Sequence, residues 1–420
     1  MVPRRSRSMP AACGTLGRSF KAGTAMPERS AMTAVPRTER TTPPATERPA
    51  SFLFPDGLLA LEGGSVRRGR LRGAAVPAEG DLIFTTAATG WGEILTDPSY
   101  AGQIVVLTHP MAGSYRISGD EMESSRVHAR ALVVTRLITP PAGPGRSLEE
   151  MLTEAGIPAL EGIDTRALTL ELRGGAARRA VIRGVAADAD AGLKAVEEAR
   201  SSATWESVDH VAGVSTPCPW VMPAIGERRA RAVLVDYGVK GSLLRALATR
   251  GLELTVLPHD ASADDVAAAE PELVILSPGP GDPARMASQI ATVAQLATRA
   301  IGGGPRILGI CLGHQLLALA AGARTQRLAV GHHGGNHAVL ELSSGRVDIG
   351  AHNHEVTVLD GPELIAADYA VSHRDLNDGT VEGLAHASGR IASVQFHPEG
   401  APGPIDAARV FDVALAGAIS

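Results

Sequence analysis

The sequence predicts an α/β protein in which a β-rich α/β domain is followed by a doubly wound, mainly parallel sheet. From residue 52 onward, short apolar runs are separated by Gly and Pro, which is typical of strands joined by turns. After residue 230, continuous apolar strands alternate with helical patterns, as in a parallel sheet covered on both faces. We therefore place the two domains at 52–200 and 230–420, with an irregular, Pro-containing linker at 201–229.

Residues 1–51 are predicted to lie outside both domains. They have almost no apolar periodicity and are rich in Pro, Ser, Thr and Arg, so they cannot bury enough surface to offset their ordering entropy. We expect disorder or a misannotated start, with translation beginning downstream, for example at Met26 or Met32. A cleaved organelle transit peptide remains an alternative, although the segment lacks a clear amphipathic helix.

Composition excludes several classes of protein. The 420 residues are enough for two or three domains, and no uncharged apolar run approaches the length of a bilayer span. Residues 1–50 carry a charge of +6 and the remainder −11, so an acidic body argues against a nucleic-acid-binding surface. Cys13, Cys218 and Cys311 are too sparse for a disulfide framework or a paired metal site, which suits a reducing cytoplasm.

The first domain is expected to begin with strands and continue with two helices. The strands are predicted within residues 56–64, 80–86, 102–110 and 128–138. Helical patterns follow at 147–156 and 164–175, and each ends on glycine.

The second domain is expected to alternate strand and helix. The strands are predicted at 231–236, 252–258, 272–277, 306–310 and 390–396, and the helices at 237–251, 263–271, 284–304 and 313–323. Ligands of such sheets bind beyond the carboxyl ends of the strands, so the residues that follow each strand matter most. Those segments are 236–238, 277–283, 311–313 and 397–400.

Cys311 lies in the segment GICLG, Gly309 to Gly313, between a predicted strand and a predicted helix. This pattern is typical of a strained elbow that exposes a nucleophile over a helix N-terminus, where the helix dipole stabilises a thiolate. The glycines are expected because a Cβ there would clash with neighbouring backbone. A buried core cysteine is the ordinary alternative. The flanking glycines favour the nucleophile.

A base and its orienting group are predicted in the segment FHPE. His397 and Glu399 are two residues apart, so both can project to the same side of an extended chain. A thiolate nucleophile needs such a base, and the base needs an orienting partner. The pair is weak evidence alone and gains weight because it falls at the same sheet edge as Cys311.

The segment SPGPGDP, residues 277–283, follows a strand. Gly279 can let a backbone N–H approach a developing oxyanion, together with the N–H of Leu312. An ordinary tight turn is the simpler interpretation. A phosphate-binding loop is disfavoured, because no Gly-Lys-Ser/Thr follows and proline removes donors.

Taken together, GICLGHQLLA, LSPGPGDP and FHPE resemble the class I glutamine amidotransferase domain. The segments TTAATGWGEILTDPSYAGQIVVLTHP, ESSRVHARALVV and IDTRALTLELR are similar to the N-terminal domain of the carbamoyl phosphate synthase small subunit, and GHHGGNHAV and HPEGAPGPIDA match that family too. The resemblance covers residues 52–415. It implies a glutaminase that passes ammonia to a large subunit, which makes carbamoyl phosphate from bicarbonate and two ATP for arginine and pyrimidine synthesis.

The resemblance also implies roles for individual residues. Cys311 would attack the glutamine side-chain amide to form a thioester, His397 would transfer protons, and Glu399 would hold the tautomer of His397. The oxyanion donors would be Gly279 and Leu312. The glutamine-binding positions would be Ser99, Gly279, Gly281, Leu312, Gln315, Asn353, Glu355 and Val356. No metal and no cofactor is implied on this chain, because ATP and Mg²⁺ belong to the large subunit.

Two segments depart from the family pattern. Glu355 and Val356 stand where the family commonly has Gly-Phe, so a carboxylate comes near the carboxylate of the substrate or else points away. Pro278 replaces a residue with a backbone N–H, so we assign no donor there.

The sequence allows three competing interpretations. The residues His332, His333, His337, His352, His354 and His373 invite a zinc amidohydrolase, but no helical His-x-x-x-His pair or partnered carboxylate spacing appears. A non-catalytic scaffold is disfavoured by retention of Cys311, His397 and Glu399. The glutaminase of another pathway, such as anthranilate synthesis, would share the second domain but not TGWGEILTDPSY.

Overall fold

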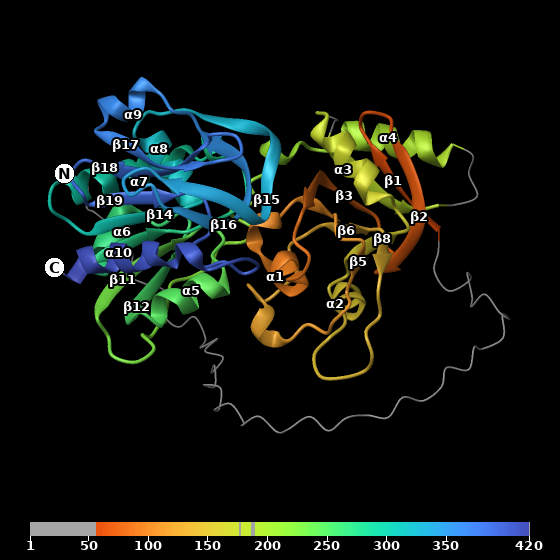
Figure 1. Cartoon of the computed structure of the whole chain (residues 1–420), viewed down its shortest axis with the longest axis horizontal. Helices are drawn as coiled ribbons and strands as arrows, with labels where there is room; N and C mark the ends of the chain where they lie inside the picture. Colours follow the sequence, from red (N-terminus) through yellow and green to blue (C-terminus); the bar gives the residue numbers. More distant parts are fainter. Residues whose placement is uncertain (1–55, 176–177, 186–189, 420) are drawn as a thin grey trace, which may run out of the picture. The chain divides into compact units, whose positions relative to one another are not determined.

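The computed structural model describes residues 56–175, 178–185 and 190–419 (Figure 1). The predictions for residues 1–51 therefore concern a part of the chain outside the described residues. The described chain contains a closed β-barrel, a ten-stranded sheet and a two-stranded sheet. The predicted fold class, a β-rich α/β domain followed by a doubly wound domain, is confirmed.

The barrel has the strand order β1-β2-β8-β6-β4-β3-β9. Its strands are β1 (Asp56–Leu61), β2 (Val66–Gly73), β3 (Ala78–Thr85), β4 (Gln103–Leu107), β6 (Ala131–Val134), β8 (Pro158–Glu161) and β9 (Arg179–Gly184). The pairs β3–β4, β4–β6 and β6–β8 are parallel, whereas the pairs that involve β1, β2 or β9 are antiparallel. The four predicted strands are present as β1, β3, β4 and β6.

The remaining barrel strands were not predicted, and β2 shows why. Four of its eight residues, VRRGRLRG, are arginine, and only Leu71 and Arg72 near its end are buried. The strand therefore has no apolar alternation to detect. The helices of this domain are α1 (Trp91–Thr96), α2 (Leu148–Glu154), α3 (Thr165–Arg173) and α4 (Ala191–Ser201). The two predicted helices are α2 and α3.

The ten-stranded sheet has the order β10-β12-β11-β13-β14-β19-β18-β16-β15-β17. The strands β12 (Leu252–Pro258), β11 (Ala230–Asp236), β13 (Leu273–Leu276), β14 (Arg306–Ile310) and β19 (Ile391–Val394) run parallel in its middle. The antiparallel strands at its margins are β10 (Trp220–Met222), β15 (Thr325–Glu341), β16 (Val347–Val358), β17 (Tyr369–Asp375) and β18 (Val381–His386).

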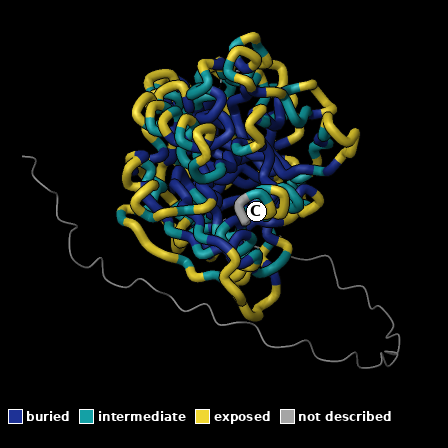
Figure 2. The backbone as a smooth tube through the Cα atoms, turned by 90° about the vertical axis from the view of Figure 1, so that its left-hand side faces the viewer, coloured by how far each residue is buried: buried dark blue, intermediate teal, exposed yellow. Residues whose placement is uncertain are grey.

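Helices cover both faces of the parallel strands, as predicted. Val233 and Val235 of β11 belong to one apolar cluster, while Ala232 and Leu234 belong to another, because successive residues of a strand face opposite sides. The first cluster includes residues of α7 (Ala287–Ile301) and α8 (Leu312–Ala320), and the second includes residues of α5 (Gly241–Ala248) and α10 (Arg409–Ile419). Figure 2 shows these buried segments in the interior, with exposed segments at the outer turns.

The antiparallel strands β15 to β18 were not predicted. The segment of β15 that carries its histidines contains Gly331, Gly334 and Gly335, and its pairing with β16 is interrupted by two register shifts. A strand with these features lacks the regular alternation of apolar and polar residues on which prediction depends. The small helices α6 (Ala263–Ala268) and α9 (Pro362–Ala366) complete this domain.

The segment expected as an irregular linker, 201–229, also contributes structure. It contains β10, which pairs with β12, and a short 3-10 helix at Trp205–Ser207. Across the described ranges, we find no helix whose length and apolar character would let it cross a bilayer.

Candidate active site

Cys311 lies at the turn between β14 and α8, where it adopts φ 52° and ψ −103°. Its backbone N–H donates to the carbonyl of Val394 at 2.8 Å, and only 2 % of the residue is exposed. A Cβ added at Gly313 would lie 2.2 Å from the carbonyl oxygen of Leu276, and one at Gly309 would lie 2.8 Å from the carbonyl oxygen of Gly313. The elbow therefore needs both glycines, for the reason predicted from the sequence.

Two groups contact the sulfur of Cys311. The side-chain Nε2 of Gln395 lies 3.6 Å from Sγ, and the backbone carbonyl oxygen of Asn353 lies 4.0 Å from it. Gln395 was not singled out from the sequence. It precedes His397 by two residues, so the same alternation that pairs His397 with Glu399 could have indicated it.

His397 and Glu399 meet as predicted. Nδ1 of His397 lies 2.8 Å from Oε1 of Glu399, and the backbone N–H of His397 donates to the carbonyl of Ala351. Burial disfavours the charged ring, but Glu399 outweighs this effect and raises the pKa of His397 to about 10; the Cys311 side chain also favours the protonated ring. The other ring nitrogen, Nε2, is buried and has no protein partner within the described chain.

Lys240 is a further charged member of this group, and sequence reasoning missed it. Its Nζ lies 3.1 Å from Oε1 of Glu399 and donates to the carbonyl of Gly400 at 2.8 Å, with 2 % of the residue exposed. Burial works to raise the pKa of Glu399, but Lys240 and His397 together lower it to about 2. The carboxylate therefore stays charged beside the imidazole. The signal in the sequence was a lysine shortly after β11, at the sheet edge where ligands bind.

A small cavity of about 20 Å³ opens beside Cys311. A space of this size holds about one water molecule, so a larger ligand enters only when lining groups move. The predicted binding residues that line it are Ser99, Gly279, Gly281, Gln315, Asn353, Glu355 and Val356. Leu312 is buried at the first position of α8 and does not line the cavity.

The glycine loop lines the same cavity as Cys311 and packs closely against neighbouring backbone. A Cβ at Gly279 would lie 2.2 Å from the carbonyl oxygen of Tyr237, and Gly281 has φ +102°, a conformation that favours glycine. The carbonyl of Pro278 accepts a hydrogen bond from the hydroxyl of Ser277 at 2.8 Å. Only glycine allows the backbone to pass this near to its neighbours.

The barrel domain supplies part of the cavity wall. Ser99 follows α1, and Gln103 begins β4; both line the cavity and are at most 4 % exposed. The hydroxyl of Ser99 and Oε1 of Gln103 are buried, and neither has a hydrogen-bond partner among the described residues. They are therefore available to a ligand. Gln103 was not predicted, nor was Trp205, which lines the same cavity from the 201–229 segment.

The amides of Gln315 and Asn353 are held by the protein. Nε2 of Gln315 donates to the carbonyl of Val356 at 2.8 Å and to Oε1 of Gln395 at 3.0 Å. Nδ2 of Asn353 donates to Oδ2 of Asp97 at 2.9 Å. These bonds fix both side chains at the cavity wall. The side-chain oxygen of Gln315 is the part of its amide that can accept a hydrogen bond from a ligand.

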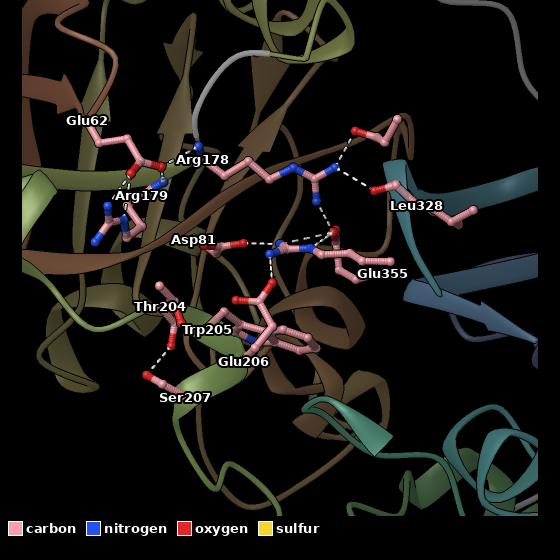
Figure 3. A network of polar contacts seen from close by, with 12 residues as sticks. Glu62, Asp81, Arg178, Arg179, Thr204, Trp205, Glu206, Ser207, Leu328 and Glu355 are labelled. Atoms are coloured by element: carbon pink, nitrogen blue, oxygen red, sulfur yellow. Dashed lines mark hydrogen bonds and ion pairs between the residues drawn. The ribbon is translucent and has the colours of Figure 1, made fainter. Parts of the chain in front are cut away.

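Glu355 faces cationic groups. Its carboxylate forms an ion pair with Arg178 (Figure 3) and another with Arg327, and its Oε1 lies 2.7 Å from Nε2 of His333. Burial works to raise the pKa of Glu355, but His333 and the two arginines lower it to about 2. The extra carboxylate therefore lines the cavity in its ionised form, and the neighbouring cationic groups balance its charge. Neither arginine was predicted, because each is far from Glu355 in sequence.

Arg327 also connects the ten-stranded sheet to the barrel domain. It forms ion pairs with Asp81 of β3 and with Glu206, and its guanidinium carbon lies 5.7 Å from the centre of the Trp205 ring (Figure 3). His333 bridges the site in another direction, because its Nδ1 lies 2.8 Å from Oδ1 of Asn353. One polar network therefore links the cavity wall to β3.

The six histidines considered for a metal site separate into groups. His333 lies on the cavity side with Asn353 and Glu355. His373 packs its ring edge-on against Phe396, with the centroids 5.6 Å apart. The rings of the remaining four, His332, His337, His352 and His354, lie side by side, with neighbouring centroids 4.5–5.7 Å apart.

Two family models match this chain. Residues 59–182 match the family model described as "Carbamoyl-phosphate synthase small chain, CPSase domain", and residues 233–416 match "Glutamine amidotransferase class-I". A carbamoyl phosphate synthase small chain of Bacillus caldolyticus is 42% identical over 363 residues, which cover 85% of this chain and 95% of that protein.

Two further relatives are similarly close. The pyrimidine-specific small chain of Halalkalibacterium halodurans is 41% identical, over 84% of this chain and 94% of that protein. The small chain of Nitratidesulfovibrio vulgaris is 41% identical, over 84% of this chain and 96% of that protein. The chain therefore belongs to the carbamoyl phosphate synthase small chain family, whose members are glutamine amidotransferase subunits.

Proposed function

We propose that this chain hydrolyses L-glutamine through Cys311, His397 and Glu399 and delivers the ammonia to a carbamoyl phosphate synthase large subunit. The observation that carries the proposal is the combination of a strained cysteine elbow with a buried His397–Glu399 pair at the neighbouring strand end. A nucleophile, a proton carrier and an orienting carboxylate are the three parts that thiol amidases require.

In the proposed first step, the sulfur of Cys311 attacks the side-chain amide carbon of glutamine and forms a carbon–sulfur bond. The carbonyl oxygen becomes an oxyanion, for which the N–H groups of Gly279 and Leu312 are the proposed donors. The tetrahedral intermediate then breaks its carbon–nitrogen bond. His397 gives its proton to the departing nitrogen, so ammonia leaves and a γ-glutamyl thioester remains.

In the second step, His397 takes a proton from water as the water oxygen attacks the thioester. The carbon–sulfur bond breaks, glutamate leaves, and the proton on His397 and the free thiolate are restored. Glu399 and Lys240 support both steps, since the charged carboxylate holds Nδ1–H of His397 and leaves Nε2 to face the reacting atoms.

The proposed glutamine site uses Ser99, Gly281, Gln315 and the 353–356 segment, all of which line the cavity. The chemistry needs no metal and no cofactor on this chain. ATP and Mg²⁺ would be used on the large subunit, which would make carbamoyl phosphate from bicarbonate, ammonia and ATP for arginine and pyrimidine synthesis.

The test is Cys311→Ser in the complex reconstituted with the large subunit. Glutamine-dependent carbamoyl phosphate synthesis should be abolished, whereas synthesis with added ammonium should persist at the wild-type rate. Equal loss of both activities would contradict the proposed role and point to a structural one. A chorismate-using partner recovered by pull-down would instead assign the chain to another glutamine-dependent pathway.

A further inference from the structure

The strand β16 presents different chemistry on its two faces. Asn353 and Glu355 line the cavity beside Cys311. His352 and His354 alternate with them, so their side chains project from the opposite face of the strand, while His354 still borders the cavity. Within the hairpin, His332 of β15 is the direct partner of His354 across the ladder. Three imidazoles thus gather behind the substrate-facing side of β16.

A carboxylate completes this group. Glu382 of β18 lies with Oε1 3.9 Å from Nδ1 of His332 and 3.9 Å from Nε2 of His354, while its Oε2 lies 3.6 Å from Nδ1 of His352. Nδ1 of His352 lies 3.1 Å from Nε2 of His354. One donor atom from each residue falls within 4.8 Å of all the others, and all four residues are buried. We call these four residues the His3Glu cluster.

Outer partners fix which ring nitrogens face inward. Nδ1 of His354 donates to the carbonyl of Val356 at 3.0 Å, which leaves Nε2 with a lone pair toward Glu382. Nε2 of His332 lies 2.9 Å from Oδ2 of Asp378, which leaves Nδ1 facing the same way. Metal-binding histidines have this arrangement, in which the distal N–H is held by a carbonyl or a carboxylate.

The cluster also contains unsatisfied polar atoms. Nδ1 of His332 and Oε2 of Glu382 are buried and make no hydrogen bond to any described residue. Side-chain exposure of Glu382 and His352 is 0%. Buried polar atoms without partners are costly, so a group that accepts their lone pairs would stabilise the fold.

We propose that the His3Glu cluster binds one divalent first-row transition-metal ion, with Zn²⁺ as the expected occupant. Three imidazole nitrogens and one carboxylate oxygen form a donor set that suits zinc, whereas Ca²⁺ and Mg²⁺ prefer oxygen ligands. Zinc–ligand distances of about 2.0–2.2 Å place neighbouring donor atoms a little over 3 Å apart, so side-chain rotations would close the 3.6–3.9 Å separations.

A second possible set shares one of these ligands. His332, His337 and Asp375 also bring three donor atoms together. Nδ1 of His337 already lies 2.9 Å from Oδ2 of Asp375, so this pair is satisfied without a metal. The His3Glu cluster is favoured because it has four donors and because two of its inward-facing atoms, Nδ1 of His332 and Oε2 of Glu382, make no hydrogen bond to any described residue.

The metal would be a structural ion that takes no part in the reaction. It would join β15, β16 and β18 beside the segment that carries Asn353 and Glu355, and so fix that segment. This role differs from that of a catalytic zinc in an amidohydrolase. It also does not rest on the proposed glutaminase function, because a glutaminase-inactive chain would still hold the ion.

The test is titration of the full-length, chelator-treated chain with Co²⁺, which gives a visible absorption band when bound by nitrogen and oxygen ligands in a low-symmetry site. We expect one Co²⁺ per chain, displaced by one Zn²⁺, and a higher midpoint of thermal unfolding in the presence of Zn²⁺. His352→Gln and Glu382→Gln should each weaken binding by more than the roughly 10- to 100-fold that follows loss of an outer partner.

Two controls separate this site from others. His386→Gln removes another buried histidine of β18, whose Nδ1 lies 2.9 Å from the hydroxyl of Ser388, and should leave Co²⁺ binding unchanged. Cys311→Ser should also leave it unchanged, which excludes the nucleophile as the ligand. The absence of Co²⁺ binding by the wild type, or binding that survives both His352→Gln and Glu382→Gln, would overturn the proposal.

A measurement on the wild type guards against variants that fail to fold. X-ray absorption at the zinc edge of the zinc-loaded chain should show about three imidazole nitrogens and one carboxylate oxygen at ordinary zinc distances. A spectrum with a sulfur ligand, or with oxygen ligands alone, would place the metal elsewhere and would likewise overturn the proposal.

Discussion

The ammonium of Lys240 lies 3.1 Å from the carboxylate of Glu399, and both side chains are at most 3 % exposed. The same carboxylate oxygen lies 2.8 Å from Nδ1 of His397. The His397–Glu399 pair therefore lies beside a buried cation that keeps Glu399 charged. The imidazole alone would offset less of the desolvation penalty of the buried carboxylate. Lys240 therefore contributes to the electrostatic stabilisation of charged Glu399.

Replacement of Lys240 by Met should remove this charge and keep most of the side-chain volume. The free energy of unfolding should fall by about 3–5 kcal/mol, because a buried carboxylate loses one of its partners. The pKa of Glu399 should rise from about 2, so the acid limb of the kcat/KM profile should move to higher pH. Urea unfolding and pH-dependent glutaminase assays measure these two effects.

Lys240→Arg is the matched control for that variant. It keeps a cation beside Glu399 and should restore the acid limb even where packing is imperfect. A Lys240→Met protein with an unchanged pH profile would show that the lysine acts only through packing.

The strain at Cys311 predicts an inverted order of stability. Glycine normally destabilises a position relative to alanine by about 0.5–1 kcal/mol, but at φ 52° and ψ −103° only glycine is unstrained. Cys311→Gly should therefore be more stable than Cys311→Ala by about 1 kcal/mol, and both should lack glutaminase activity. Urea unfolding of the two variants tests this. A Cys311→Ala protein more stable than Cys311→Gly would show that the backbone at residue 311 is not strained.

The pair Arg178–Glu355 should show strong energetic coupling. Single replacements Glu355→Gln and Arg178→Met each leave a charge at the cavity wall without a main partner, whereas the double replacement removes both. We expect a coupling of about 1–3 kcal/mol in a double-mutant cycle of unfolding free energies. Both single variants should also raise KM for glutamine. A coupling near zero would indicate that Arg327 and His333 alone neutralise Glu355.

The free energy of unfolding should depend on pH through His397 and Glu399. The pKa of His397 is raised in the folded chain, so its contribution is complete below about 6.5 and is lost as the pH rises through about 10. The pKa of Glu399 is lowered, so its contribution is complete above about 4.5 and is lost as the pH falls through about 2. Stability should therefore be highest between those limits.

Glu399→Gln separates these two contributions. It removes the carboxylate that raises the pKa of His397, so the decline in stability on the alkaline side should become shallower. Urea unfolding from pH 5 to pH 10 measures the slope. An unchanged alkaline slope would assign it to other groups.

The sequence predicted the parts of the site that follow from local pattern. Cys311 was identifiable because a strand, two glycines and a helix adjoin it, and His397 because it follows the strand β19. The pairing of Ile310 with Val394 in adjacent parallel strands then brings these two strand ends together. Parallel topology thus turns two local signals into one site.

The rest depended on contacts between segments distant in sequence. Lys240 and Glu399 are 159 residues apart in the sequence, and no local pattern predicts their contact. The ion-pair partners of Glu355 likewise come from distant segments, Arg327 from β15 and Arg178 from the residue before β9. The strand β15 was missed because its glycines and histidines hide the alternation. Once β16 is recognised as a strand, the order His-Asn-His-Glu at 352–355 indicates two faces with different chemistry.

The most direct test of the account is to look for the covalent intermediate. The wild-type chain mixed with glutamine, quenched in acid and digested should yield a peptide that contains Cys311 and carries the mass of one γ-glutamyl group. The Cys311→Ser chain should yield none. Glutamine turnover that persists in Cys311→Ser, or a γ-glutamyl group found only on another residue, would contradict the assignment of Cys311 as the nucleophile.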